Sequence, residues 1–423
     1  MKLPASLAPM RHRDFAIVWA AGFVSNAGSW MQTVAVGAFV TARTGQASWA
    51  GLAAAAAFLP IGLLAPIGGA LADRFDRRIF VMIASIFEAV MATLLAWMAA
   101  TGRAHPGSVT VVVFVAGCIG ALRLPFQQAM ILDLVERDEF LAAASLGSAQ
   151  YNFGRVFGPS LAAVVIAVWG YSWAFTVNAV SFFAVVAAMA VIRLPHIRSL
   201  DGTRLWERIR IGARATRANP GARAAITLMA VVAFLVSPFI ALIPARAYQL
   251  APHNAGRVAA ITGWLTTAQG IGAVIGALAI APLAARFGRR RMLLLNVVAT
   301  PLALIAYAAV PSEAAAVALL GLVGALYIGV LSGLQNVVSL WAPVELRGRI
   351  LSLYLVALGA IYPIGGLFQG WIADKIGLTE TTTAGALALV AIVAVWRATR
   401  PTILHPLTDP DELGIDPENF ASV

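Results

Sequence analysis

Twelve apolar stretches, separated by short segments rich in charged residues, glycine and proline, constrain this chain more than any other feature of its sequence. A helix needs about 20 mostly apolar residues to cross a bilayer, and each stretch is close to or above that length. Alternating ten-residue strands are absent from the sequence, which excludes a transmembrane barrel. We therefore predict an all-α membrane protein with twelve transmembrane helices, at 15–40, 49–72, 79–100, 109–132, 141–167, 173–192, 224–244, 258–285, 292–310, 314–341, 350–373 and 379–396.

Two of these predicted spans are weaker than the rest, namely 379–396 and 224–244, which Pro238 interrupts. The first stretch, 15–40, is too long for the apolar core of a signal peptide and is not followed by a small-residue cleavage site. We therefore expect it to stay in the protein as an uncleaved signal anchor.

The composition agrees with a membrane-embedded chain. Hydrophobic residues make up 60% of the sequence and charged residues 12%, whereas a soluble domain has roughly 45–50% and 25%. A disordered chain, a coiled coil and almost any cytosolic enzyme are thereby excluded. The single cysteine, Cys118, excludes an intramolecular disulfide and a multi-cysteine metal site. We expect no metal centre, no cofactor and no catalytic residues.

Basic residues are distributed unevenly between the two sides of the predicted membrane. Of 30 lysines and arginines, 23 fall in the termini and even-numbered loops, 5 in the odd-numbered loops, and 2 inside spans. Positive residues accumulate on the cytoplasmic side, so we expect both termini there, in a bacterial cytoplasmic membrane. The net charge of +11 then reflects topology and anionic lipid at the inner leaflet rather than binding to nucleic acid.

The spans divide six and six around a long polar loop. We expect an N-terminal half at 1–193, a cytoplasmic linker at 194–223 and a C-terminal half at 224–397. The tail 398–423 is acidic and rich in proline, and it is predicted to be disordered.

A short charged motif occurs once in each half. The segment 73–78 (Asp-Arg-Phe-Asp-Arg-Arg) follows the second span, and 285–290 (Ala-Arg-Phe-Gly-Arg-Arg) follows the eighth. A second pair of similar segments, 134–137 and 343–347, precedes the fifth and eleventh spans. Two parallel six-helix repeats related by a pseudo-twofold axis are typical of a large class of secondary transporters.

The motif residues resemble those of the major facilitator superfamily, whose loop pattern is Gly-x-x-x-Asp-Arg-x-Gly-Arg-Arg. The matching residues are Gly69, Asp73, Arg74, Arg77 and Arg78. Three more segments, 24–32, 153–159 and 347–354, are similar to the enterobactin-exporter and macrolide-efflux-like branch of drug and siderophore exporters. The resemblance covers nearly the whole chain, and it implies the superfamily fold of two six-helix halves around a central substrate site. Asp76 stands where the pattern has glycine, and Ala285 stands where the second copy should have aspartate.

The first motif copy, Gly69, Asp73, Arg74, Arg77 and Arg78, is predicted to act as a conformational switch. Asp73 ends the second helix, where the helix dipole is negative, so its carboxylate needs a facing cation or helix N-terminus. The start of the eleventh span is the expected partner. A contact that forms in one state and breaks in the other would bias alternating access. The alternative is a permanent loop clamp that only enforces topology.

Three charged residues, Glu88, Arg123 and Arg155, fall inside predicted spans. At 1.5 Å per residue they lie about 14–21 Å from the cytoplasmic boundary, near the middle of the bilayer. An unpaired charge there costs about 2.5–3.5 kcal/mol, so we expect Glu88 to pair with one or both arginines. Glu88 would be the protonatable group for proton-coupled antiport, or the pair would only join helices. Both interpretations stay open at this point.

Polar side chains at helical spacing predict a neutral, hydrogen-bonding substrate cavity in the helices that line it in this superfamily. The same residues could instead join neighbouring helices. Gly158 and Pro159 are predicted to kink the fifth span. The cavity candidates are Ser25, Ser29, Gln32, Gln127, Gln150, Asn152, Thr266, Gln269, Gln335, Asn336 and Tyr354.

From these features we expect a monomeric secondary transporter that exports lipophilic drugs or siderophore-like small molecules, driven by a proton gradient. The partners are the lipid bilayer and a small-molecule substrate. An importer or uniporter of an amphiphilic solute is the alternative within the same class. A membrane-embedded enzyme or a membrane protein that only mediates interactions belongs to a different class and is disfavoured, because the five histidines lie in predicted loops or tails.

Overall fold

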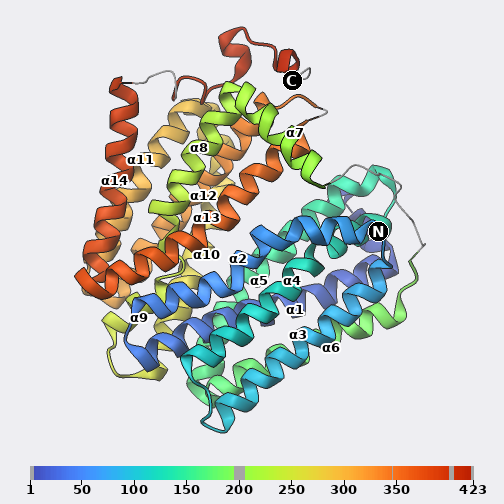
Figure 1. Ribbon diagram of the computed structural model, residues 1–423, viewed down its shortest axis with the longest axis vertical. Helices are drawn as coiled ribbons and strands as arrows, with labels where there is room; N and C mark the ends of the chain where they lie inside the picture. Colours follow the sequence, from blue (N-terminus) through green and yellow to red (C-terminus); the bar gives the residue numbers. More distant parts are fainter. Residues whose placement is uncertain (1–3, 195–204, 345, 400–403, 421–423) are drawn as a thin grey trace. The chain divides into compact units, whose positions relative to one another are not determined.

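The computed structural model describes residues 4–194, 205–344, 346–399 and 404–420, and these residues form α-helices joined by turns and short 3-10 segments (Figure 1). The expectation of an all-α protein is confirmed. The helices of the first half of the sequence are α1 (Arg13–Thr44), α2 (Ala47–Ala72), α3 (Arg77–Ala100), α4 (Pro106–Asp133), α5 (Phe140–Trp169) and α6 (Tyr171–Val191). Those of the second half are α7 (Leu205–Ala218), α8 (Pro220–Leu235), α9 (Ile243–Leu250), α10 (Ala255–Phe287), α11 (Arg289–Ala309), α12 (Glu313–Trp341), α13 (Arg347–Ile376) and α14 (Leu378–Thr399).

The helix ends follow local backbone chemistry. Gly45 ends α1 in a left-handed conformation, with φ of 67°, and its N–H donates to the Thr41 carbonyl oxygen. The side chain of Asp76 accepts a hydrogen bond of 3.0 Å from the Ile79 N–H and so caps the N-terminus of α3. These short polar signals therefore set where one long helix stops and the next one starts.

Eleven helical segments among the described residues are long and apolar enough to cross a membrane, and they correspond to the second through twelfth predicted spans. The first predicted span lies within α1, whose 32 residues are enough to cross, although Ser25, Asn26, Ser29 and Gln32 make it less apolar. The stretch around Pro238 is interrupted as predicted, because Ser237–Phe239 forms a 3-10 turn between α8 and α9. The other weak span is the continuous helix α14.

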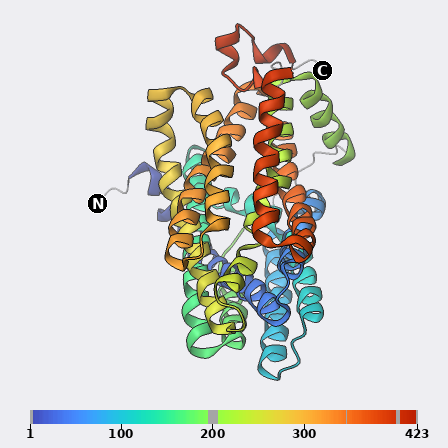
Figure 2. The ribbon, with the colours of Figure 1, turned by 90° about the vertical axis from the view of Figure 1, so that its left-hand side faces the viewer.

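The chain divides into two compact units. Unit 1 contains Met1–Gly45, Leu52–Gly202 and Ala247–Thr267, and unit 2 contains Gln46–Gly51, Thr203–Arg246 and Ala268–Val423. Within unit 1, α3 packs against α6 and α4, and α1 packs against α5 and α6. Within unit 2, α11 packs against α12 and α14, and α8 packs against α12 and α13, as can be followed by colour in Figures 1 and 2. Each unit thus consists mainly of one half of the sequence.

Each unit also holds one short segment from the other half of the sequence, through close backbone contacts. In unit 2, a Cβ added to Gly370 of α13 would lie 2.8 Å from the Ala47 carbonyl oxygen at the start of α2. The Asp374 carboxylate accepts hydrogen bonds from the Ala47 N–H at 2.6 Å and the Ser48 N–H at 3.2 Å. In unit 1, a Cβ on Gly263 of α10 would lie 2.7 Å from the Pro159 carbonyl oxygen of α5. Glycine allows the approach at both places.

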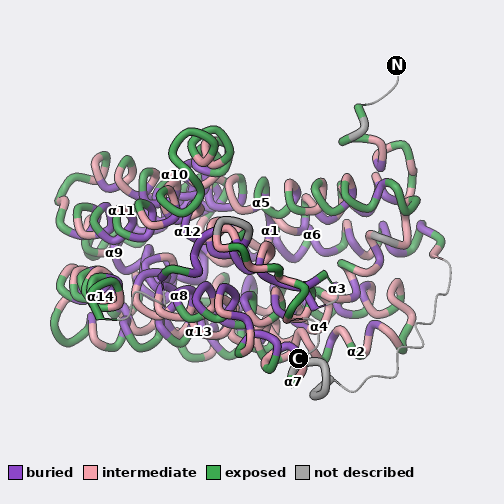
Figure 3. The backbone as a smooth tube through the Cα atoms, turned by 90° about the horizontal axis from the view of Figure 1, so that it is seen from above, coloured by how far each residue is buried: buried purple, intermediate pink, exposed green. Residues whose placement is uncertain are grey.

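Much of α10 keeps its surface exposed, in contrast to α8 (Figure 3). An exposed apolar helix of this length agrees with a surface that faces lipid or a solvent-filled passage in the membrane.

Parts of the predicted linker and tail are ordered. Residues 205–218 of the linker form α7, and α7 packs against α13. The segment 404–420 was expected to be disordered, but it folds on unit 2, with Leu404 and Leu407 buried. The Trp341 indole N–H donates to the Thr408 carbonyl oxygen at 2.9 Å, and Arg289 pairs with Asp409 at 3.0 Å. The two buried leucines supply a contact that the acidic, proline-rich composition of the tail did not indicate.

Candidate functional site

Three residues in the first charged motif, Asp76, Arg77 and Arg78, hold unit 1 together at one end of its helices. Arg77 pairs with Asp133 at the end of α4 at 2.5 Å. Arg78 donates from Nε to the Met189 carbonyl oxygen at 2.5 Å and from Nη2 to the Ala190 carbonyl oxygen at 3.0 Å, at the end of α6. Asp76, which departs from the superfamily pattern, caps α3. These contacts stabilise helix ends, because guanidinium groups satisfy carbonyls at the negative end of the helix dipole.

Asp73 and Arg74 have a different environment from the rest of the motif. Asp73 is partly buried and Arg74 is exposed, and neither side chain makes a hydrogen bond or ion pair with another described residue. A Cβ on Gly69 would meet nothing within 4 Å. Within the motif, Asp76, Arg77 and Arg78 therefore form a clamp. The Asp73 carboxylate has no hydrogen bond or ion pair to another described residue.

Glu88 and Arg123 form an ion pair between the middle of α3 and α4. Arg123 Nε lies 2.7 Å from Glu88 Oε2, and Arg123 Nη2 donates to Glu88 Oε1 at 3.4 Å. Arg123 Nη1 also donates to Gln127 Oε1 at 2.7 Å, one turn further along α4. The Glu88 side chain is only 8% exposed. The predicted cavity residue Gln127 is thus a partner of the buried charge pair.

Arg155 of α5 lies beside an aromatic ring of α1. Its guanidinium carbon lies 5.9 Å from the centre of the Trp30 ring of α1, within the range of a cation–π interaction. Trp30 also contacts Tyr151 edge-on, with ring centres 5.7 Å apart, and Phe58 of α2 at 6.2 Å. The sequence indicated that Glu88 would pair with one or both arginines, and the structure assigns the two arginines different surroundings.

Several predicted cavity residues join helices instead of pointing into open space. The Gln150 side chain donates to the Trp19 carbonyl oxygen at 2.7 Å, and Gln32 accepts from Asn178 at 2.8 Å. The Tyr354 hydroxyl donates to the Leu331 carbonyl oxygen at 2.7 Å, and its side chain is buried. Ser25, Thr266 and Gln269 are buried as well. The helix-joining interpretation describes Gln150, Gln32 and Tyr354, whereas the Thr266 hydroxyl donates to the Thr262 carbonyl oxygen of its own helix.

Other candidates are accessible. Asn152, Gln335 and Asn336 are exposed, and Ser29 is partly exposed. On α5, Asn152 lies beside Tyr151, which is 50% exposed, and one turn before Arg155. A guanidinium in the middle of a membrane avoids lipid and faces protein or water. We therefore expect this face of α5 to lie against protein or water rather than against lipid.

Gly158 and Pro159 place α5 close to α1. A Cβ on Gly158 would lie 2.5 Å from Trp30 Cβ and 2.6 Å from the Ala27 carbonyl oxygen. The α5 helix continues through Pro159 to Trp169. Proline removes one backbone hydrogen bond at this point, and the neighbouring glycine allows the contact that positions Trp30.

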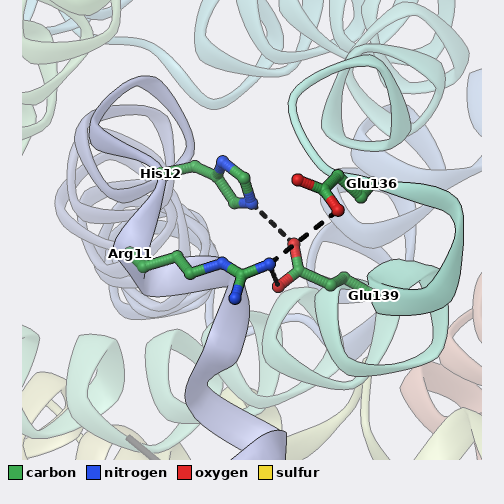
Figure 4. Close-up of polar contacts among 4 residues, drawn as sticks. All are labelled: Arg11, His12, Glu136 and Glu139. Carbon is green, nitrogen blue, oxygen red and sulfur yellow. Dashed lines mark hydrogen bonds and ion pairs between the residues drawn. The ribbon is translucent and has the colours of Figure 1, made fainter. Parts of the chain in front are cut away.

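Three groups of polar contacts involve residues that the sequence did not indicate. One is the Asp374 cap on α2 described above. Another is Arg246, which donates to the Val310 carbonyl oxygen and lies over the Tyr307 ring at 5.9 Å. In the third, the buried Glu139 lies 3.0 Å from Arg11 and 2.6 Å from the His12 ring nitrogen (Figure 4). The sequence signal for all three is a charged residue next to a predicted helix end, which is too common to be specific.

Comparison with known proteins agrees with the predicted class. The family model described as transmembrane secretion effector matches residues 4–407. The multidrug efflux pump Tap of Mycolicibacterium fortuitum is 27% identical over 89% of this chain and 93% of its own length. Macrolide efflux protein A of Streptococcus pyogenes is 24% identical over 90% of this chain and 94% of its own length. The staphyloferrin A transporter of Staphylococcus aureus is 22% identical over 89% of this chain and 94% of its own length.

Among solved structures, the chain is similar to a bacterial homologue of the human lysosomal transporter Spinster, in an inward-facing and occupied conformation. The TM-score is 0.72 at 15% identity, and the match covers 94% of this chain and 98% of the other. At this identity the similarity establishes the fold. It is the fold that the repeated motif and the twelve apolar stretches predicted.

Proposed function

We propose that this chain, which belongs to the transmembrane secretion effector family of the major facilitator superfamily, exports lipophilic drugs or siderophore-like small molecules by proton-coupled alternating access. Its family and its efflux-pump relatives support a secondary transporter of the membrane rather than an enzyme. Relatives named for multidrug efflux, macrolide efflux and staphyloferrin A transport support export and this range of substrates.

The observation that carries proton coupling is the buried Glu88–Arg123 pair. A carboxylate held in the membrane interior can bind a proton, and protonation cancels its charge interaction with the neighbouring guanidinium. Arg123 has a second partner in Gln127 at 2.7 Å. When Glu88 takes a proton, Arg123 can therefore keep one hydrogen bond while the ion pair weakens. We propose that this exchange links protonation to the position of α4 relative to α3.

The motif loop supports alternating access. Asp76, Arg77 and Arg78 clamp the helix ends of unit 1, while Asp73 makes no bond to a described residue. We propose that Asp73 faces the N-terminus of α13 in another state of the transport cycle. Its carboxylate would then be stabilised by the positive end of the helix dipole.

We propose that the protein is a monomer in a bacterial cytoplasmic membrane, with both termini in the cytoplasm. The orientation is supported by the basic residues, because 23 of 30 fall on one side of the spans. The clamp arginines Arg77 and Arg78 belong to that side.

The test is transport in inverted membrane vesicles with an imposed pH gradient, using a panel of antibiotics and catecholate siderophores. The wild-type protein is expected to accumulate at least one compound in a gradient-dependent manner. Glu88→Gln is expected to abolish the dependence on the gradient, because the amide cannot exchange a proton. Asp138→Asn removes an exposed carboxylate near the end of α4 and serves as the control with unchanged coupling.

Three outcomes would contradict the proposal. If Glu88→Gln transports with an unaltered pH dependence, Glu88 has no part in coupling. If no compound accumulates in inverted vesicles but one accumulates in right-side-out vesicles, the protein is an importer. Transport that follows only the substrate gradient would indicate a uniporter.

A further inference from the structure

An aromatic–cation cluster lies on unit 1, formed by Trp30 of α1, Phe58 of α2, and Tyr151 and Arg155 of α5. Trp30 is at its centre, with ring centres 5.7 Å from Tyr151 and 6.2 Å from Phe58. The Arg155 guanidinium carbon lies 5.9 Å from the Trp30 ring centre. Three helices thus place three rings and one permanent positive charge together, in the interior of the predicted spans.

The cluster is accessible rather than packed in a core. Tyr151 is 50% exposed, and Trp30, Phe58 and Arg155 are partly exposed. Tyr151 and Asn152 lie one helical turn before Arg155 on α5, so each is a surface neighbour of Arg155. Because a mid-membrane guanidinium and an exposed amide both avoid lipid, this face is suited to a passage that holds water or solute.

The geometry of the cluster is fixed by the contact between α1 and α5. Gly158 lets Trp30 approach α5, since an added Cβ would lie 2.5 Å from Trp30 Cβ. One turn earlier, Asn26 Nδ2 donates to the carbonyl oxygens of Gln150 and Tyr151, both at 3.2 Å. The backbone that carries Tyr151 is therefore tied directly to the helix that carries Trp30, so the rings are positioned before any ligand arrives.

Charge distinguishes the solutes that this cluster can accept. More than one turn from the helix ends, the described helices of unit 1 carry one carboxylate, Glu88, and two guanidinium groups, Arg123 and Arg155. Glu88 forms its ion pair with Arg123 at 2.7 Å. The interior of unit 1 thus has a net charge of +1 when Glu88 is ionised, and the second guanidinium is the one beside the rings.

We propose that the aromatic–cation cluster binds an aromatic acid, with the ring of the solute packed on Trp30 and Tyr151 and its anionic group at the Arg155 guanidinium. Aromatic contact accepts any planar ring, whereas a charge-assisted hydrogen bond to Arg155 requires an acidic group. An aromatic cation of the same shape meets repulsion in a medium of low dielectric constant. The inference rests on the proposed transport function and narrows its substrate class to aromatic anions.

The experiment compares two probes that share a ring and differ in charge, 2-naphthoate and 2-naphthylmethylamine. Binding to the purified full-length protein in lipid nanodiscs is measured by titration calorimetry. The wild-type protein is expected to bind naphthoate at least about tenfold more tightly than the amine. Arg155→Gln is expected to remove this preference, and Arg155→Lys to retain part of it. Trp30→Ala is expected to weaken binding of both probes.

The matched control is Arg103→Gln. Arg103 lies over Trp97 at 5.3 Å, so this variant removes a similar arginine–tryptophan contact outside the cluster, after the end of α3. It is expected to leave the binding of both probes unchanged. The thermal transition of each variant, compared with that of the wild type, shows whether the protein remains folded.

Three results would overturn the inference. The first is no binding of naphthoate by the wild-type protein, and the second is equal affinity of the wild type for both probes. The third is a folded Arg155→Gln variant that loses affinity for both probes to the same extent. A failure of the proposed function is distinguishable from these. In that case naphthoate binds with the expected dependence on Arg155, but the reconstituted protein moves no compound in response to a proton gradient.

Discussion

The stability of the buried ion pair between Glu88 and Arg123 depends on both partners. The Glu88 carboxylate is almost fully buried and lies 2.7 Å from Arg123 Nε. Removing one partner of a buried ion pair leaves an uncompensated charge, while replacing both with apolar or neutral groups avoids that penalty. Because Gln127 remains bonded to Arg123, the two single substitutions are not equivalent.

We predict that Arg123→Met lowers the free energy of unfolding by about 3–5 kcal/mol, because Glu88 is left buried without its cation. Glu88→Gln is expected to cost less, since Arg123 keeps Gln127 as an acceptor. The double variant Glu88→Gln/Arg123→Met should recover most of the loss. Thermal unfolding in a single detergent measures all three. Additive losses in the double variant would show that the pair does not contribute to stability through this contact.

At the scale of elements, the start of α2 and the end of α13 form a seam within unit 2. Gly370 faces Ala47 and Ser48, and one turn later the Asp374 carboxylate caps α2 through two backbone N–H groups. Carboxylates stabilise helix N-termini. Asp73 ends α2 at its opposite end without a bond to a described residue. The two ends of α2 therefore differ in the state seen here.

We predict that Gly370→Val impairs transport, because a Cβ there would lie 2.8 Å from the Ala47 carbonyl oxygen and 2.9 Å from Ser48 Cα. Forced overpacking of this kind costs about 1–3 kcal/mol and would push α2 away from α13. Gly359→Val on the same helix is the control, since a Cβ at Gly359 meets nothing within 4 Å. Gradient-driven transport is measured for both. Equal activity of the two variants would show that this seam does not limit the cycle.

At the scale of the whole molecule, residues distant in sequence complete unit 2. The segment 404–420 returns to the end of α12, where the Thr408 carbonyl oxygen accepts from the fully buried Trp341 and Asn219 Nδ2 donates to the Trp341 carbonyl oxygen at 2.5 Å. In Figures 1 and 2 the red C-terminal segment lies at one end of the helices of unit 2. The tail thus supplies the hydrogen-bond acceptor for the indole N–H of a buried tryptophan.

We predict that Leu407→Ser lowers the free energy of unfolding by about 1.5–3 kcal/mol, the value of burying a leucine side chain. Leu407 is 1% exposed, whereas Asn419 in the same segment is exposed, so Asn419→Ala serves as the control. Thermal unfolding of both variants and the wild type in the same detergent measures the change. An unchanged transition in Leu407→Ser would show that the segment contributes nothing to the stability of unit 2.

Local patterns in the sequence determined the helical class, eleven of the apolar spans, the interruption at Pro238 and the repeated motif, because spanning length, helix breakers and charge are properties of neighbouring residues. Tertiary structure alone decided that Glu88 meets Arg123 while Arg155 meets Trp30. It also decided that Gln150 and Tyr354 join helices and that residues 404–420 fold on unit 2. Helical periodicity tells which residues share a face, but the neighbour of that face depends on packing between distant segments.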